Sequence, residues 1–485
     1  MTRLFYGSVI NPISVHKADF QTRTLLAVSP AGIIEWVEHD VDSSDIQRVA
    51  LEKGLVLDES VQVHELKYGE WLMPGFVDTH THAPQFPNIG IGGQYELLDW
   101  LNNVTFPTET RFADLEFAER VYSSVVDRVL NSGTTTCCYY GTLHLEATKL
   151  LSKIIHERGQ RAFVGKCNMD RNSEPYQEPS VAQSIADTKA LISYIRSLSS
   201  SLRNHVNGHA LEPPSSTLVH PILTPRFAIS CTPELLSALG EIASSDPTLA
   251  IQTHISENTK EIEFTRTLFP ECMSYAHVYK HYGLLNERTI LAHAVHLEDE
   301  EMRMVHECGA GVSHCPTSNF YLNSGVAPIG EMLDRGIKVG LGTDCSGGFS
   351  PSILTAVRDA IVASKIIAMA PRPTHFKGGT LANKTLPLSA VLYMSTLGGA
   401  QLCNLDKSIG SLVQGKEFDA VLVSVRPESG NPGVWANLAS DKEPVGMPLD
   451  TLEALLEKYF FCGDDRNVRR VWVRGRTVGG AESKL

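Results

Sequence analysis

The stretch PGFVDTHTHAPQFPN, residues 74–88, carries two histidines one residue apart, just after the apolar pair Phe76-Val77. Side chains at positions i and i+2 of a β-strand lie on the same face, so His80 and His82 are predicted to point the same way. Two imidazoles on one face can bind a single metal ion. A lone histidine in a strand is usually structural, and it is the pairing at a strand end that indicates a metal site.

From this stretch onward, short apolar strands alternate with amphipathic helices, for example over 113–131 and 328–335. Eight such units predict an α/β fold of the (β/α)8 TIM-barrel type. An open doubly wound sheet is the alternative, but no GxGxxG turn is present to open it. The eight expected strands cover 73–80, 134–140, 161–168, 219–226, 249–255, 289–293, 310–314 and 337–343.

Both ends of the chain show β-like runs separated by turns, and neither end is long enough for a core of its own. We expect the two ends to combine into one small β-sandwich domain. The predicted domains are residues 1–72 plus 408–485 for the β-sandwich and residues 73–407 for the barrel. Residues 197–217 are rich in Ser, Pro and Asn and lack periodicity, so they are expected to form a surface insertion.

Composition excludes several classes of protein. The chain has 55 acidic and 42 basic residues and a net charge of -13, which opposes binding to nucleic acid. No apolar run approaches the roughly 18 residues of a membrane span. Ten cysteines without a CxxC pair, and no signal peptide at the start, predict reduced thiols in an intracellular compartment.

The last three residues, Ser483-Lys484-Leu485, match the peroxisomal address tripeptide. The sequence therefore predicts a peroxisomal location, with the cytoplasm as the alternative if the tripeptide is not used.

Three more ionisable residues fall at the ends of predicted strands. His254 ends the fifth strand, His293 ends the sixth and Asp344 follows the eighth. The carboxyl ends of barrel strands form one mouth, where catalytic groups gather. Histidines and a carboxylate that meet there suit a borderline ion such as Zn²⁺, with one position left open for water.

Four further residues have both a structural and a functional interpretation. Glu257 is either a capping acid, if a helix begins near Ser256, or a general acid/base beside the metal. Arg226 either pairs with a loop acid or binds a substrate oxygen. Phe227 belongs either to the core or to a stack on a flat ligand. Gln85 is either an ordinary loop residue or an amide that reads a base edge.

Seven motifs carry a resemblance that covers nearly the whole chain. In content and order they resemble the metal-dependent amidohydrolase superfamily. HxH and TD mark only the superfamily, whereas HAPQ, PRF and WLNNVTFP are more specific and resemble its guanine deaminase branch in its fungal form. The motifs are PGFVDTHTHAPQFPN, LLDWLNNVTFP, LTPRFAIS, THISEN, LAHAVHL, SHCPTSN and GLGTDCSGG.

The resemblance implies a homodimeric hydrolase that converts guanine to xanthine and ammonia, a step of purine catabolism, with one Zn²⁺ per subunit. It implies no nucleic-acid or membrane partner. The insertion at 197–217 departs from the family in length, and the second histidine of LAHAVH, His296, is expected outside the direct ligand set. The implied ligands are His80, His82, His254 and Asp344; the implied proton shuttles are Glu257 and Asp344, with His293 near the hydroxide; and the implied substrate contacts are Gln85, Arg226 and Phe227, bordered by His82 and His254.

Two alternatives to guanine deamination stay open on the sequence. One is a related amidohydrolase that acts on another ring, such as 8-oxoguanine, a pterin or a triazine. The other is a barrel that has lost its metal and serves as a scaffold, which the presence of all four ligand residues disfavours. The zinc deaminases that act on cytidine use a PCxxC motif, and this chain has none.

Overall fold

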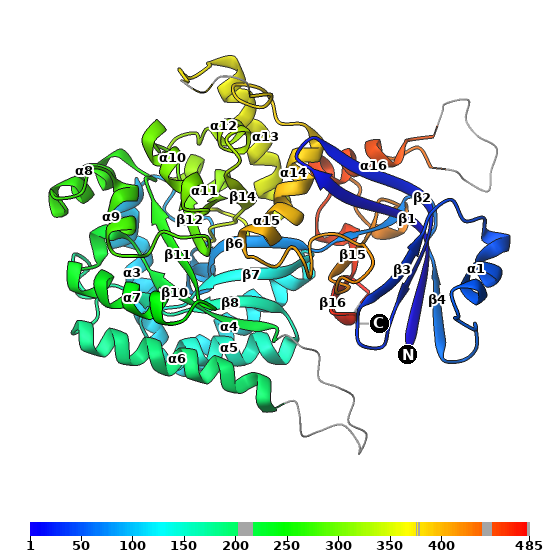
Figure 1. Ribbon diagram of the computed structural model, residues 1–485, viewed down its shortest axis with the longest axis horizontal. Helices are drawn as coiled ribbons and strands as arrows, with labels where there is room; N and C mark the ends of the chain where they lie inside the picture. Colours follow the sequence, from blue (N-terminus) through cyan, green and yellow to red (C-terminus); the bar gives the residue numbers. More distant parts are fainter. Residues whose placement is uncertain (202–216, 375, 377–378, 439–448, 483–485) are drawn as a thin grey trace.

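The computed structural model describes residues 1–201, 217–374, 376, 379–438 and 449–482. The C-terminal tripeptide and most of the segment 197–217 therefore lie outside the described residues. Figure 1 shows a barrel wrapped by helices and, beside it, a smaller sheet in which blue strands from the start of the chain lie next to orange and red strands from its end. Among the described residues, no helix is both long and apolar enough to cross a membrane.

Eight parallel strands close into the barrel that the sequence predicts. Neighbouring strands pair in chain order, and Leu341 of the last strand opposes Asp78 of the first, which completes the ring. The short β9 (Cys167–Asn168) adds a pairing beside β10. The barrel strands are β6 (Phe76–His82), β7 (Thr134–Tyr140), β8 (Arg161–Gly165), β10 (Val219–Pro225), β11 (Ala250–Ile255), β12 (Thr289–His293), β13 (Gly311–His314) and β14 (Lys338–Leu341).

Helices cover the outside of the ring, as expected for βα units (Figure 1). The predicted helices at 113–131 and 328–335 are confirmed as α4 and α12, and Asp114 caps α4 by accepting from the backbone N–H of Glu116. The longer helices of the barrel are α4 (Leu115–Asn131), α5 (Leu145–Arg158), α6 (Val181–Ser201), α7 (Pro233–Ser245), α8 (Thr259–Leu268), α9 (Tyr275–His281), α10 (Asp299–Glu307), α11 (Pro316–Tyr321), α12 (Ile329–Asp334), α13 (Ile353–Met369), α14 (Leu388–Ser395) and α15 (Leu397–Leu402).

Helix α6 corrects one prediction. It runs to Ser201, so residues 197–201 are helical and do not belong to an irregular insertion. Leu191 and Ile195 anchor the helix in a buried cluster with α4 and α5. Serine has only a modest helix penalty, so an anchored helix can continue over a short serine-rich stretch.

A run of short helices follows β6 and lies above one side of the barrel. It consists of η2 (Ala83–Asn88), α2 (Leu97–Trp100), η3 (Leu101–Thr105), α3 (Phe106–Thr110) and η4 (Arg111–Ala113). The remaining helices are η1 (Ser43–Asp45), α1 (Ile46–Glu52), η6 (Ala228–Ser230), η7 (Pro427–Ser429), α16 (Leu452–Cys462) and η8 (Asp465–Asn467).

The two chain ends form one eight-stranded sheet, which fits the expected small domain. Its order is β17-β16-β15-β5-β1-β2-β3, with β4 paired to β1. The Phe5 and Trp472 rings are in contact at 5.5 Å, although β1 and β16 are three strand spacings apart, about 14 Å in a flat sheet. The sheet therefore folds over on itself around a shared core. Its strands are β1 (Thr2–Ser14), β2 (Lys17–Val28), β3 (Ile34–Glu38), β4 (Val61–Glu65), β5 (Glu70–Pro74), β15 (Ala420–Ser424), β16 (Val468–Val473) and β17 (Arg476–Gly479).

The division into residues 1–72 plus 408–485 and residues 73–407 stays a prediction. Strand β5 crosses its first boundary, since it pairs with β15 through Pro74. We call the end of the barrel where the strands finish the mouth and the end where they begin the floor. A layer of apolar side chains closes the interior between them, with contributions from Val77, Cys138, Phe163, Ile222, Ala250, Ile290 and residues of α15.

Candidate active site

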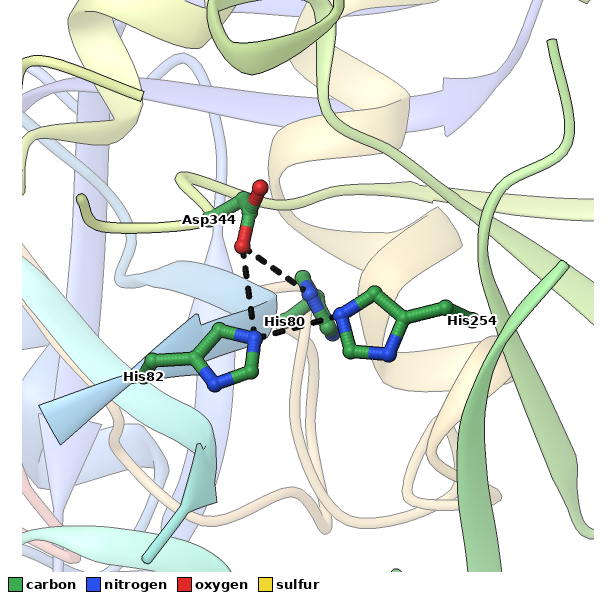
Figure 2. Close-up of side chains that lie close together, drawn as sticks. All are labelled: His80, His82, His254 and Asp344. Atoms are coloured by element: carbon green, nitrogen blue, oxygen red, sulfur yellow. Dashed lines mark hydrogen bonds and ion pairs between the residues drawn. The ribbon is translucent and has the colours of Figure 1, made fainter. Parts of the chain in front are cut away.

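Four of the predicted ligands meet at the mouth (Figure 2). His80 and His82 project from the end of β6, His254 from β11 and Asp344 from the loop after β14. Asp344 Oδ1 lies 3.2 Å from His80 Nε2 and 3.5 Å from His82 Nε2, and the Nε2 atoms of His82 and His254 are 3.2 Å apart. All four side chains are nearly or fully buried. The structure thus brings together the four residues that the sequence predicts as ligands, and their binding of a metal ion stays a prediction.

The chemistry of these donors fits a metal ion. Ligand atoms that surround a tetrahedral ion at about 2.0–2.1 Å are about 3.3 Å apart, close to the separations found here. His254 Nδ1 donates to the backbone carbonyl of Arg226 at 2.7 Å, which leaves the Nε2 lone pair directed at the cluster. Burial, followed by the neighbouring histidines, lowers the pKa of His82 and of His254, so both are neutral, as a metal ligand must be.

A second group at the mouth has metal-ligand spacing, formed by His80, His293 and Cys315. The Cys315 thiol donates to the backbone carbonyl of Ser313 at 3.5 Å. Burial raises the pKa of Cys315 well above its ordinary value, so the sulfur is protonated. A thiol binds metals as the thiolate, which makes this group the weaker candidate of the two.

The backbone around the cluster adopts a rare conformation at four non-glycine residues. Ser256, His293, Ala294 and Asp344 have φ values of 48°, 73°, 50° and 43°. Each such residue costs on the order of 1–3 kcal/mol and persists only where the surroundings enforce it. The four lie where β11, β12 and β14 give way to the mouth, so the fold holds the site residues in place at the expense of local strain.

Glu257 lies at the mouth, but not where the sequence suggested. Helix α8 begins after Asn258, which is extended and caps it, so Glu257 precedes the helix and is not in its first turn. Glu261 from that first turn accepts from the backbone N–H groups of Glu257 and Asn258. The left-handed Ser256 turns the chain before the helix can begin.

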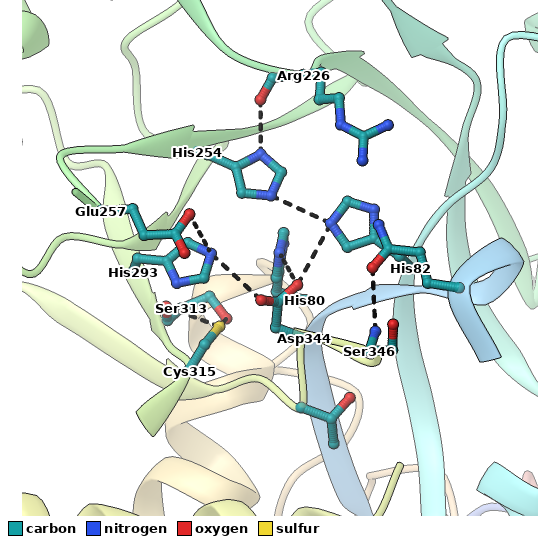
Figure 3. Close-up of polar contacts among 12 residues, drawn as sticks. His80, His82, Arg226, His254, Glu257, His293, Ser313, Cys315, Asp344 and Ser346 are labelled. Carbon is teal, nitrogen blue, oxygen red and sulfur yellow. Dashed lines mark hydrogen bonds and ion pairs between the residues drawn. The ribbon is translucent and has the colours of Figure 1, made fainter. Parts of the chain in front are cut away.

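Glu257, His293 and Asp344, for which the sequence predicts roles in proton transfer, lie close together (Figure 3). His293 Nε2 lies 3.4 Å from Glu257 Oε2 and 3.7 Å from Asp344 Oδ2. On its other side, His293 Nδ1 donates to Asn319 Oδ1 at 2.9 Å, which fixes the Nε2 lone pair toward the two acids. Burial lowers the pKa of His293 to about 4, so the ring is neutral near physiological pH.

The two carboxyl groups are shifted in opposite directions. Burial, and then the charge of Asp344, raises the pKa of Glu257 well above its ordinary value. Burial alone would raise the pKa of Asp344 too, but its hydrogen bond with His80 and the nearby His293 more than offset this and lower it. Two acids whose pKa values diverge in this way can act as a proton donor and a proton acceptor.

Asp78 supports the loop that carries Asp344. Its carboxylate accepts from the backbone N–H and the hydroxyl of Thr343, at 3.0 and 2.5 Å, and from the backbone N–H of His80 at 3.2 Å. Asp78 thus links β6, which carries the proposed ligands His80 and His82, to Thr343, which precedes the proposed ligand Asp344. Burial raises the pKa of Asp78 to about 7.

Arg226 lies at the mouth in a buried ion pair with Glu109 of α3. Its two terminal nitrogens donate to the two oxygens of Glu109 at 2.7 and 3.1 Å. Gln85 Nε2 donates to the same carboxylate at 3.0 Å, and the backbone N–H of Ser346 donates to Gln85 Oε1 at 3.2 Å. The structural and the functional interpretations of Arg226 are therefore compatible, because the paired Arg226 also lines the cavity described next.

A cavity lies beside the four-residue cluster. Its lining combines polar side chains with apolar and aromatic ones, as is usual in sites for small molecules. The Phe227 ring stacks on His254 with centroids 4.3 Å apart, so Phe227 braces a ligand residue as well as lining the cavity. The lining consists of His82, Gln85, Leu97, Trp100, Leu101, Arg226, Phe227, His254, Glu257, Leu322 and Asp344.

Sequence reasoning missed Glu109, Asn319 and Asp78. Asn319 and Asp78 lie inside motifs that were recognised, SHCPTSN and PGFVDTH, but they were given no role. Glu109 lies just beyond the WLNNVTFP motif, and its helix gives no local sign of the contact with Arg226, 117 residues away in the chain. His296 Nε2 donates to the backbone carbonyl of Ser324 at 2.7 Å, and His296 belongs to neither metal-ligand group found among the described residues.

Residues 71–478 match the amidohydrolase family. The guanine deaminase of Dictyostelium discoideum is 40% identical, with 98% of each chain covered, and the probable guanine deaminase of Schizosaccharomyces pombe is 42% identical, with 99% of this chain and 84% of that one covered. A crystal structure of guanine deaminase from C. acetobutylicum with bound guanine in the active site has a TM-score of 0.81 and 30% identity, and covers 98% of this chain and 100% of that one. Triazine hydrolase from Arthobacter aurescens, at 20% identity and a TM-score of 0.76, shares the fold. The chain is a member of the amidohydrolase family and, within it, of the guanine deaminases.

Proposed function

We propose that the chain catalyses the hydrolytic deamination of guanine to xanthine and ammonia. The observation that carries this proposal is the placement of three features around one small cavity: a His₃Asp cluster, a pair of carboxyl groups with diverging pKa values, and a guanidinium-amide pair. The similarity to guanine deaminases over nearly the full chain supports the choice of substrate.

His80, His82, His254 and Asp344 are the proposed ligands of one zinc ion. Three imidazoles and a carboxylate suit a borderline divalent cation. A bound zinc ion supplies Lewis acidity, which lowers the pKa of a water molecule to about 7. Asn319 and the Arg226 carbonyl orient the imidazoles of His293 and His254 from behind.

Asp344 and Glu257 move the protons in this proposal. Asp344, with its lowered pKa, accepts a proton from the attacking water. Glu257, with its raised pKa, delivers a proton to a ring nitrogen next to C2 of guanine. The water oxygen bonds to C2, the bond from C2 to the exocyclic amine breaks with a proton placed on the nitrogen, and ammonia and xanthine result. His293 donates no proton as a neutral ring and orients the acids.

Arg226, Gln85 and Phe227 are the proposed readers of the base. Arg226 donates toward the carbonyl oxygen O6, Gln85 contacts another edge, and Phe227 lies against the ring, with His82 and His254 bordering it. A purine that lacks O6 leaves buried donors without a partner, a source of strong discrimination.

The test is release of ammonia from guanine and from adenine by the purified chain after zinc loading, with zinc content measured on the same sample. We expect turnover of guanine, loss of activity on chelation and recovery with zinc. Equal rates with adenine would refute the role of Arg226, and no turnover of guanine by the zinc-loaded chain would refute the function.

We also propose a homodimer in the peroxisome. The support is the family resemblance for the dimer and the terminal Ser483-Lys484-Leu485 for the location. Light scattering of the purified chain tests the first, with a monomeric mass as the contrary result. A fluorescent protein fused to the N-terminus tests the second, with diffuse fluorescence as the contrary result.

A further inference from the structure

We propose that Glu109 makes the site selective for a neutral base and thereby favours release of the more acidic oxopurine product. The inference rests on the proposed function, since it assigns a role to the residue behind two of the proposed base readers. Glu109 does not line the cavity itself, so it acts as a positioning residue through Arg226 and Gln85.

The first support is the charge balance of the pair. The side chain of Arg226 is 1% exposed and that of Glu109 is 0% exposed, and both Glu109 oxygens accept from the guanidinium. A bidentate pair cancels the charge of the arginine while leaving N–H groups to donate elsewhere. Arg226 Nε is one of these, because it is buried and has no hydrogen-bond partner. The Arg226–Glu109 pair thus presents donors without a net positive charge.

The second support is the orientation of Gln85. A carboxylate only accepts, so Glu109 requires the NH₂ group of Gln85 to face it. The N–H of Ser346 independently requires the carbonyl end of the same amide on its side. The two contacts agree, so the amide has one orientation, and the second N–H and second lone pair of Gln85 are fixed for a ligand.

The chemistry of substrate and product gives this arrangement a consequence. Deamination replaces an amine on C2 by a carbonyl, and the added carbonyl makes xanthine the more acidic purine. An uncompensated buried guanidinium would hold the xanthine anion by a charge-assisted hydrogen bond, roughly twice as strong as a neutral one. With Glu109 in place, the anion gains no net attraction from the pair and meets the carboxyl groups of Asp344 and Glu257 nearby.

The test compares xanthine binding to the zinc-loaded chain and to its Glu109→Gln variant by calorimetry, across the pH range in which xanthine loses its proton. The substituted amide keeps an acceptor for the guanidinium but removes the charge. We expect xanthine to bind the variant about tenfold more tightly or better once it is ionised, while its binding to the unaltered chain weakens as it ionises. With guanine, the variant should show a larger change in KM than in kcat.

Two further variants guard the interpretation. Glu109→Asp keeps the charge and should retain the pH dependence of the unaltered chain, even if its affinities change. Glu178→Gln removes a different buried carboxylate, the partner of Lys166 outside the cavity lining, and should leave the xanthine profile unchanged. If Glu109→Gln does not fold, Glu109→Asp carries the test. Xanthine binding by Glu109→Asp that tightens as xanthine ionises, as predicted for an uncharged residue at this position, overturns the inference.

The outcomes separate this inference from the proposed function. Absence of guanine turnover in the unaltered chain defeats the proposed function, whereas calorimetry with xanthine still reports the role of Glu109. Xanthine binding that is equal in the unaltered chain and in Glu109→Gln at every pH overturns the inference and leaves the proposed function intact.

Discussion

The barrel buries ionisable side chains at both of its ends, and the two groups differ in how they are satisfied. At the floor, Arg161 at the start of β8 contacts Asp419, at 2.9 Å, and Glu417, and Arg474 contacts Glu417 at 2.7 Å. Each positive group there has a negative partner. At the mouth, three imidazoles and a carboxylate turn their acceptor atoms toward one another.

This contrast separates a structural cluster from a functional one. The floor ion-pair cluster of Arg161, Glu417, Asp419 and Arg474 finds its partners within the chain, and it ties the barrel to the terminal sheet, because Glu417 and Asp419 directly precede β15. At the mouth, His80 Nδ1, His82 Nδ1 and His293 Nε2 are buried without a hydrogen-bond partner. Unsatisfied buried polar atoms are costly, so they indicate a place where the fold gives up stability for function.

The largest effect is expected at the mouth, from Glu257→Gln. Turnover of guanine should fall by about 10²–10⁴-fold, because the variant loses a proton donor. Zinc content and thermal stability should stay near those of the unaltered chain, because Glu257 is not a proposed ligand. Glu263→Gln, on an exposed face of α8, is the matched control. Turnover within a few-fold of the unaltered chain would remove Glu257 from the proposed mechanism.

At the floor, Arg161→Met should lower the stability of the chain and leave its zinc content and turnover unchanged. Removing one side of a buried ion pair leaves the other charge uncompensated, which costs roughly 3–5 kcal/mol of unfolding free energy. Denaturant unfolding measures this loss, and zinc content and turnover of the folded fraction should be unchanged. Arg303, exposed on α10 with Glu300 and Glu307, is the control, and its replacement by alanine should have no measurable effect. A loss of zinc in Arg161→Met would mean that the two ends are not independent.

A smaller effect is expected from Asn319→Leu, which removes the acceptor behind His293 while keeping a similar volume. Partners of this kind typically contribute 10–100-fold in metal affinity or activity, so we expect a fall of about this size in kcat. The pH profile of kcat should also broaden toward acid, since the neutral tautomer of His293 is no longer fixed. An unchanged kcat and pH profile would show that the Asn319 contact is incidental.

The smallest effect concerns pH and stability at the floor. Burial alone would raise the pKa of Glu417, but Arg161 and Arg474 more than offset this and lower it below its ordinary value of 4.5. A carboxyl with a lowered folded-state pKa adds stability above its unfolded pKa and loses that contribution as pH falls through the folded pKa. The unaltered chain should therefore lose more unfolding free energy below about pH 4.5 than Glu417→Gln does. Parallel losses in the two proteins would contradict the pairing.

Much of this architecture is visible in the sequence because short apolar runs mark barrel strands and ligands mark their ends. His80, His82, His254 and His293 could be placed at the mouth from position alone. Contacts between elements that are distant in the chain could not be predicted from the sequence. Glu109 on α3 bonds Arg226, which is 117 residues away in the chain, and no local sequence pattern predicts this contact.

The backbone conformation at the mouth was the other feature that could not be predicted from the sequence. The sequence allowed a helix to begin near Ser256 and to include Glu257, but the left-handed Ser256 and the extended Asn258 place Glu257 before the helix. A glycine at 256 would have signalled such a turn, whereas a serine gives no warning. The same holds for Asp344, whose φ of 43° is imposed by its surroundings.

The central claim is that four side chains from distant segments bind one metal ion. X-ray absorption at the zinc edge tests this claim most directly, on the chain loaded with one equivalent of Zn²⁺. If His80, His82, His254 and Asp344 bind the ion, the nearest scatterers are nitrogen and oxygen only, at about 2.0–2.2 Å. A sulfur scatterer at about 2.3 Å would instead place the ion on Cys315 with His80 and His293, and a failure to bind any zinc would refute the metal centre altogether.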